Sequence, residues 1–121
     1  MSYLHENLTE KIIKAFYNVY NELGYGFLEN VYENSLIVEL EAMGLVVENQ
    51  KEINVMYKGS KVGFYKADII VEDKVIIEVK AISKLIKVHE VQLINYLKAT
   101  GMRVGLLVNF GQKLDFKRRI F

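Results

Sequence analysis

The fold is decided by residues 66–80, which read KADIIVEDKVIIEVK. Two runs of apolar, largely β-branched residues flank a short polar segment at 72–74, and this pattern is typical of a β-hairpin. Three charged side chains, Asp68, Glu78 and Lys80, interrupt the apolar runs. Charged groups are rarely buried without a partner or a metal ion. The pattern therefore indicates either a half-solvated hairpin or a hairpin that holds a cation.

The length of the turn decides whether the two carboxylates meet. Side chains alternate along a strand, so Glu78 and Lys80 share one face of theirs. A three-residue turn at 72–74 would place Asp68 directly across from Glu78, with Cβ atoms about 4.5–5.5 Å apart. Two carboxylates at that distance repel each other unless a positive group lies between them. A two-residue turn would place Asp68 opposite an apolar residue, so the metal interpretation depends on register.

These residues suit one kind of chemistry. Asp68 and Glu78 could supply two ligands to Mg²⁺, which prefers oxygen ligands and keeps several waters. The backbone carbonyl of Val79 could supply a third oxygen. Lys80 would lie beside the ion, where it could orient an attacking water or stabilise charge that builds on a phosphate. The alternative is an exposed face with an ion-pair cluster, and the spacing alone leaves both interpretations open.

Composition sets the broad class. The chain has 121 residues, 51% hydrophobic and 26% charged, which predicts one globular domain over residues 1–121. It has no cysteine, which excludes disulfides, thiolate zinc sites and cysteine nucleophiles. Residues 1–10 lack the apolar run of a signal peptide, and no stretch is long enough to cross a bilayer. We therefore expect a cytoplasmic protein without a membrane partner. The net charge of +1 neither requires nor excludes nucleic acid.

Hydrophobic periodicity predicts the remaining elements. Helices are expected at residues 8–23, about 27–43 and about 88–100, each followed by a glycine. Strands are expected at residues 45–48, 53–57, 62–71, 75–80 and 104–110, and residues 113–121 read as a basic tail. The order is α-α-β-β-β-β-α-β. The helix between the last two strands suits a parallel crossover. The prediction is an α/β fold, with an α+β mixed sheet flanked by helices.

Helical spacing suggests further site residues. Glu29 lies near the start of the second predicted helix, although an acidic residue there also simply favours the helix dipole. His89, Gln92 and Tyr96 share one stripe of the third predicted helix, where they could reach phosphates or metal-bound waters. A solvent-exposed helix face explains the same stripe.

A basic cluster lies near the end of the chain. It comprises Lys113, Lys117, Arg118 and Arg119. Such a cluster could bind the phosphate backbone of a nucleic acid. Local sequence by itself favours a solvated terminal segment.

Taken together and in order, the motifs resemble the GxxExxY protein family, a branch of the PD-(D/E)XK nuclease superfamily. The naming motif reads GFLENVY over residues 26–32. The other motifs are YKAD at 65–68, IEVKA at 77–81, HEVQLINYLK at 89–98 and GLLVNFG at 105–111. The resemblance covers roughly residues 8–121. Ala67 stands where the superfamily's name has proline.

The resemblance implies a restriction-endonuclease-like core and a Mg²⁺-dependent nuclease that hydrolyses phosphodiester bonds. Asp68, Glu78 and Lys80 would be the nuclease signature, and Glu29 would bind the metal directly or through water. Gln92 and Tyr96 would position the backbone phosphate. Mn²⁺ is expected to substitute for Mg²⁺. DNA is favoured over RNA as the partner, and a homodimer is an option because nucleases of this fold often pair.

Two other functions stay open at this point. The same fold could bind nucleic acid or a protein without cutting, because a fold alone does not determine function. The chain could also be an interaction subunit that dimerises through an apolar strand edge or through residues 110–121.

Overall fold

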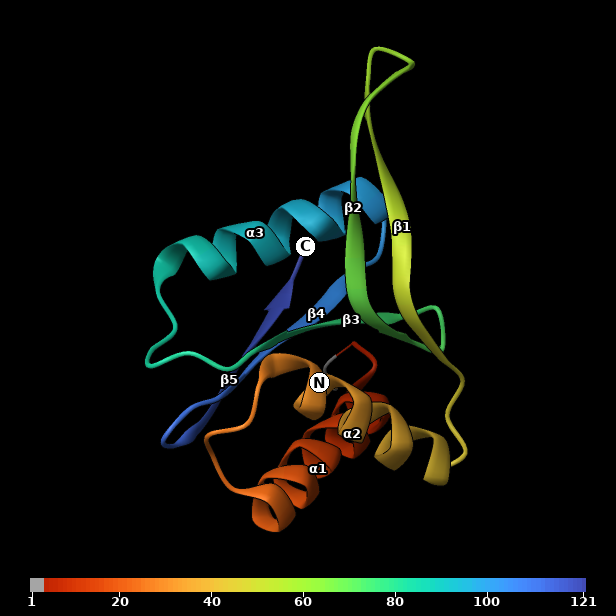
Figure 1. The fold of residues 1–121 in the computed structure, drawn as a ribbon. Coiled ribbons are helices and arrows are strands. Elements are labelled where there is room, and N and C mark those ends of the chain that lie inside the picture. The colour runs from red at the N-terminus through yellow and green to blue at the C-terminus, as the bar shows by residue number, and fades with distance from the viewer. Residues whose placement is uncertain (1–3) are drawn as a thin grey trace.

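The computed structural model describes residues 4–121, so residues 1–3 of the predicted domain lie outside the described part (Figure 1). The elements in chain order are α1 (Glu6–Leu23), α2 (Glu29–Ala42), β1 (Val47–Tyr57), β2 (Ser60–Val71), β3 (Val75–Lys80), α3 (Lys87–Thr100), β4 (Val104–Phe110) and β5 (Leu114–Ile120). The strands form one sheet in the order β1-β2-β3-β4-β5. Neighbours are antiparallel except β3 and β4, which are parallel on either side of the α3 crossover. The predicted mixed sheet flanked by helices is confirmed.

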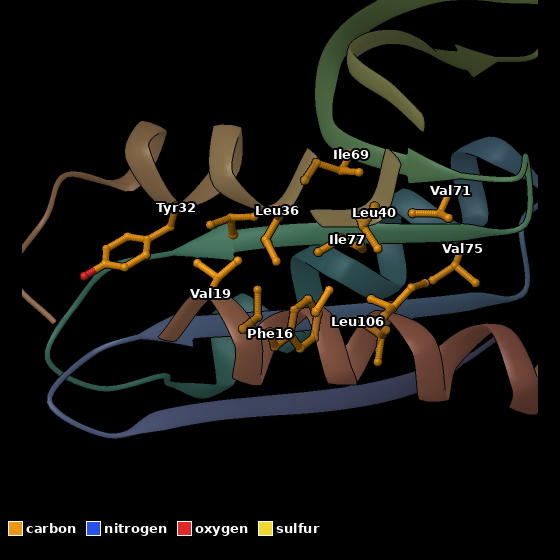
Figure 2. Close-up of a cluster of buried hydrophobic side chains, with 14 of the residues drawn as sticks. Phe16, Val19, Tyr32, Leu36, Leu40, Ile69, Val71, Val75, Ile77 and Leu106 are labelled. Atoms are coloured by element: carbon orange, nitrogen blue, oxygen red, sulfur yellow. The ribbon is translucent and has the colours of Figure 1, made fainter. Parts of the chain in front are cut away.

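The helices cover the two faces of the sheet (Figure 1). α1 and α2 pack on one face, where Phe16 and Leu36 join a large apolar core with alternate residues of β3 and β4 (Figure 2). α3 packs on the other face through Leu93 and Leu97. The side chains of β3 alternate between these cores, with Ile77 facing α1 and α2. By the same alternation, Glu78 and Lys80 belong to the α3 face.

The two central strands are almost entirely buried. Every residue of β4 is buried, and so is every residue of β3 except Lys80, which is half-buried. Covering a parallel pair of strands on both faces requires such continuous apolar runs. The polar exceptions, Glu78 and Asn109, lie toward the end of each strand, at the same end of the sheet.

Two sequence predictions about the elements are wrong. The two strands expected at 45–48 and 53–57 are one strand, β1, which begins at Val47, because the polar stretch between them pairs with β2 at the sheet edge. Residues 113–121 are not a tail, because Leu114–Ile120 forms β5 and pairs antiparallel with β4. Both strands lie at edges of the sheet, where charged side chains are common and obscure the apolar pattern. The order is therefore α-α-β-β-β-α-β-β.

The β1–β2 hairpin changes direction at its middle. Val47 on β1 and Ile69 on β2 pack with the α1 and α2 core, whereas Ile53 and Ala67 pack with the α3 core. Regular alternation would place Val47 and Ile53 on one face of β1, and Ala67 and Ile69 on one face of β2. Each strand therefore switches faces between its two residues. The switch coincides with Gln50, whose φ of 55° is rare for a residue other than glycine. Beyond it, the hairpin runs out past the end of α3 (Figure 1). We call residues 52–66 the arm.

No helix within residues 4–121 is both long and apolar enough to cross a membrane.

Candidate active site

The register of the β2–β3 hairpin is the predicted one. Val71 pairs with Val75, Ile70 with Ile76, and Ile69 with Ile77, so the turn consists of residues 72–74. The same register places Asp68 opposite Glu78. The sequence-based prediction of a three-residue turn is confirmed.

The backbone ladder stops at Ile69 and Ile77, and the two carboxylates take over the next hydrogen bonds. The N–H of Asp68 donates to Oε2 of Glu78 at 3.1 Å. The N–H of Val79 donates to Oδ2 of Asp68 at 2.8 Å. Each carboxylate therefore lies between the two strands where they separate. Each also has a second oxygen that these backbone hydrogen bonds do not use. This arrangement fixes both acids at the point where the arm leaves the sheet.

The pKa values of the three acidic side chains at the site are raised, chiefly by burial. Burial and then the charge of Asp68 raise the pKa of Glu78 to about 8. Burial also raises the pKa of Asp68, against the hydrogen bond from Val79. The pKa of Glu29 rises through partial burial and then through the charge of Asp68. Lys80 lowers all three pKa values but does not offset the rise. A further cation at the site would therefore stabilise the ionised carboxylates.

The GFLENVY motif positions Glu29. The φ of Gly26 is 112°, a conformation that favours glycine. The hydroxyl of Tyr32 accepts the N–H of Phe27 at 3.2 Å and donates to the carbonyl of Gly24 at 2.7 Å. The ring of Tyr32 stacks on Phe110 with centroids 4.5 Å apart. The tyrosine thus ties the loop to the core, and Glu29 begins α2 within electrostatic reach of Asp68 and Lys80.

A side-chain network around the buried Glu33 was missed by sequence reasoning. Oε2 of Glu33 accepts hydrogen bonds from the amides of Asn49 and Gln50, each at 2.7 Å. The Gln50 amide also donates to Oδ1 of Asp68 at 3.2 Å. Glu33 lies one helical turn after Glu29, and that spacing could have signalled it. The local sequence carries no signal for the backbone conformation that lets Gln50 bridge the two acids.

α3 contributes an aromatic residue to the other side of the site. The ring of Tyr96 stacks on Tyr65 with centroids 3.8 Å apart, and the hydroxyl of Tyr65 donates to the Tyr96 carbonyl at 3.2 Å. Burial, followed by the charges of Glu78 and Asp68, raises the pKa of Tyr96, so its hydroxyl senses both carboxylates. The structure therefore brings Tyr96 near the predicted centre.

The other members of the α3 stripe have different surroundings. Gln92 lies one turn before Tyr96 and is exposed. His89 accepts the N–H of Ile86 through Nδ1 at 3.0 Å and caps the helix start. The stripe is therefore divided between the site and the helix terminus.

Comparison with known proteins agrees with this geometry. Residues 6–120 match the PD-(D/E)XK nuclease superfamily. The chain belongs to that superfamily. Its members typically use divalent metal ions. None of the curated proteins compared with the chain matches it.

A solved structure shows the same fold. The crystal structure of SSO0001 matches with a TM-score of 0.59 and 19% sequence identity. The alignment covers 96% of this chain and 59% of SSO0001. This chain therefore corresponds to little more than half of that longer relative. At this identity the likeness concerns the fold alone.

The oxygen donors of the site can be compared with the ligands that a divalent metal ion requires. Within residues 4–121, no group of three or more His, Asp or Glu side chains is arranged as a metal site. Asp68 and Glu78 are paired across the hairpin, and Glu29 on α2 lies within electrostatic reach of Asp68. A set of few carboxylates suits Mg²⁺, which retains much of its water, better than a metal that needs a closed protein cage. The residues present therefore fit a hydrated divalent cation.

A cleft of about 480 Å³ adjoins the site. Its lining includes Phe27 and Leu28 just before Glu29, and Ala81 and Ile82 just after Lys80. The side-chain amide of Asn109 holds that second segment, because it accepts the N–H of Ile82 and donates to its carbonyl, both at 2.9 Å. Asn109 thus shapes the backbone that follows the nuclease signature.

The predicted basic cluster is not one surface. The guanidinium of Arg118 donates to the carbonyl of Leu4 at 2.6 Å, whereas Arg119 forms an ion pair with Glu90 on α3. Successive residues of β5 point to opposite faces of the sheet, which separates the two arginines. Lys117 directly precedes Arg118 on β5, so the two side chains point to opposite faces. Lys113 is exposed and lies just before β5. A nucleic-acid role for these four residues stays a prediction, and they lie on the side of the sheet away from β2.

Proposed function

We propose that this protein is a metal-dependent nuclease of the GxxExxY branch that hydrolyses phosphodiester bonds, with DNA as the favoured substrate. The observation that carries the proposal is a pair of hydrogen bonds across the hairpin: the N–H of Asp68 donates to the Glu78 carboxylate, and the N–H of Val79 donates to the Asp68 carboxylate. This pair of hydrogen bonds holds two carboxylates with raised pKa values in the gap between separating strands. Structural ion pairs would instead lower these pKa values.

Asp68, Glu78 and Val79 would hold Mg²⁺. In a strand, the N–H and C=O of one residue point to the same side. The N–H of Val79 points to Asp68, so its carbonyl also faces the gap. Glu29 would bind the ion directly or through a water, and Mn²⁺ would substitute for Mg²⁺. When bound, the ion polarises the phosphate and lowers the pKa of a bound water.

Lys80 would act on the reacting groups. It follows Glu78 by two residues, so the two side chains share one face of β3. Within residues 4–121 it forms no salt bridge, although it lies within electrostatic reach of three carboxylates. Its ammonium would orient the attacking water and stabilise charge on the phosphate. Gln92 and Tyr96 on α3 would position that phosphate from the other side.

Cleavage assays with DNA and RNA in Mg²⁺ or Mn²⁺ test this proposal. We expect Lys80→Ala to lower the cleavage rate about 10²–10³-fold, the range seen when one transition-state donor is removed. Lys84→Ala removes the same charge from an exposed position in the loop after β3 and should cleave like the wild type. Equal cleavage by the wild type and Lys80→Ala would end the role given to Lys80.

The second candidate is a nuclease-like fold that binds nucleic acid or a protein without cutting. The lack of a three-carboxylate cluster within residues 4–121 favours it. It predicts salt-dependent binding of nucleic acid with no metal-dependent cleavage. Calorimetry separates the two, because the nuclease should release or absorb heat with millimolar Mg²⁺ or Mn²⁺ and the binding module should not.

A further inference from the structure

The arm exposes side chains that a folded chain normally buries. Residues 52–66 project beyond the sheet (Figure 1). Met56, Tyr57, Val62 and Phe64 keep 56%, 62%, 61% and 57% of their surface exposed. Packing does not account for these residues, since the apolar core lies elsewhere. Several large apolar side chains exposed on one hairpin are typical of a surface that contacts another molecule.

The positive charge of the arm favours a polyanion as its binding partner. Residues 52–66 contain the lysines Lys58, Lys61 and Lys66 and one acid, Glu52, so the arm carries +2 in a chain of net +1. Glu52 pairs with Lys61 at 3.5 Å on the surface. A second copy of the chain would bring the same positive charges together, whereas phosphates would be attracted to them.

Aromatic rings accompany the lysines. The ammonium of Lys58 lies 5.4 Å from the ring centroid of Tyr57, and that of Lys61 lies 5.0 Å from the ring centroid of Phe64. Exposed aromatic rings interleaved with cations are the surface on which nucleic-acid strands are held, through phosphate contacts and stacking.

The base of the arm is tied to the candidate active site. Tyr65 stacks on Tyr96, and Ile53 packs in the α3 core. Lys66 precedes Asp68 by two residues on β2, and Lys66 pairs across from Glu52. The lysine-bearing strand thus leads directly from the carboxylate pair to the arm tip.

We propose that the arm binds the phosphate backbone of the substrate to one side of the cleavage site. The proposal rests on the proposed nuclease function for the position of that site. With a rise of about 3.3 Å per residue, β2 reaches roughly 30 Å from Asp68 to the tip. Duplex DNA rises about 3.4 Å per base pair, so the tip of the arm would lie about nine base pairs from the scissile phosphate.

The test measures DNA binding in EDTA, where metal-dependent cleavage does not occur. Fluorescence anisotropy with a 30-base-pair duplex over a range of salt gives the slope of log Kd against log salt. The triple variant Lys58→Gln, Lys61→Gln, Lys66→Gln should bind more weakly, with a slope smaller by about 2.7, since each lost phosphate contact removes about 0.9. A single strand of the same length tests which form the arm prefers, and the slope should fall for at least one of them.

A matched control removes three exposed lysines elsewhere. Lys11→Gln, Lys14→Gln, Lys74→Gln changes the net charge equally at positions on α1 and in the β2–β3 turn. It should keep the wild-type slope. A second arm variant, Phe64→Ala, removes a ring without changing charge, and we expect weaker binding with an unchanged slope. A wild-type slope and affinity in the triple arm variant, with its thermal unfolding unchanged, would overturn the proposal.

The remaining outcomes separate the arm from the nuclease. Cleavage by the wild type together with wild-type binding by the arm variant would reject the arm and keep the nuclease. Arm-dependent binding without cleavage in any metal would reject the nuclease and keep the arm as a binding surface. Light scattering tests whether a second copy of the chain, rather than DNA, binds to the arm. If Phe64→Ala turned a dimer into a monomer and left DNA binding intact, the arm would be a self-association surface, and the proposal would be wrong.

Discussion

The central strands β3 and β4 and the arm of the β1–β2 hairpin are opposites in composition and surroundings. β4 is buried throughout, and β3 is buried up to Lys80. In the arm, by contrast, Met56, Tyr57 and Phe64 each expose more than half of their surface. The two regions meet where Asp68 and Glu78 exchange hydrogen bonds with the facing strands.

Each region contains a residue type that its surroundings disfavour. Glu78 is a carboxylate 8% exposed within the apolar sheet, and burial raises its pKa to about 8. Phe64 is an aromatic residue in water. Solvation favours neither an ionised Glu78 at this position nor an exposed Phe64, because a buried charge and an exposed apolar surface are both poorly solvated. The contrast teaches that stability alone does not explain the residues to which we assign a function in the two proposals.

The largest expected effect is on catalysis. Glu78→Gln keeps the size of the buried side chain and removes its charge, so we expect cleavage in Mg²⁺ to fall about 10²–10³-fold or more. Glu41→Gln, at an exposed position near the end of α2, is the control and should retain activity. Undiminished cleavage by Glu78→Gln would mean that the buried carboxylate has no part in the reaction.

The second-largest expected effect is a difference in how much a truncation in β3 and one in the arm lower the free energy of unfolding. Ile77→Ala in β3 should lower the free energy of unfolding by about 2–5 kcal/mol, because it leaves a cavity in a fully buried strand. Val62→Ala in the arm should change it by less than about 0.5 kcal/mol. Urea unfolding of both variants measures the difference. Similar losses would show that the arm contributes to the core after all.

The dependence of stability on pH should identify the buried carboxylate. The pKa of Glu78 is raised in the folded state, so between about pH 4.5 and 8 the unfolded chain binds fewer protons than the folded chain. The contribution of Glu78 to stability is therefore fully present below pH 4.5 and is lost as the pH rises toward 8. In EDTA, the wild type should lose stability over this range relative to Glu78→Gln, by a few kcal/mol at most, since one pKa unit corresponds to about 1.4 kcal/mol. Parallel stability curves for the two proteins would contradict the assignment.

The smallest effect concerns the junction between the two regions. Gln50 has a φ of 55°, which glycine adopts more readily than alanine. Gln50→Gly should therefore be more stable than Gln50→Ala by about 1 kcal/mol, although both variants lose the amide that bridges Glu33 and Asp68. Thermal unfolding of the matched pair measures the difference, and equal stability would mean that the backbone relaxes once the amide is gone.

Local pattern predicted most of the elements. The strand at 104–110 agrees with β4, and the three helices agree within a few residues of their ends. The turn at 72–74 predicted the opposition of Asp68 and Glu78, because alternation and turn length are properties of a short segment. β5 and the continuity of β1 were missed, since each is an edge strand whose pairing partner lies elsewhere in the chain.

The sequence by itself determined the apolar periodicity of the elements, the hairpin register and the order of the motifs. All of these depend on neighbours along the chain. Only the tertiary structure brought Glu29 and Tyr96 to the hairpin, separated Arg118 from Arg119, and placed Gln50 between two acids. Packing also determined which carboxylates have raised pKa values. Burial and long-range contact depend on how helices and strands meet in space, and no local pattern of residues records that.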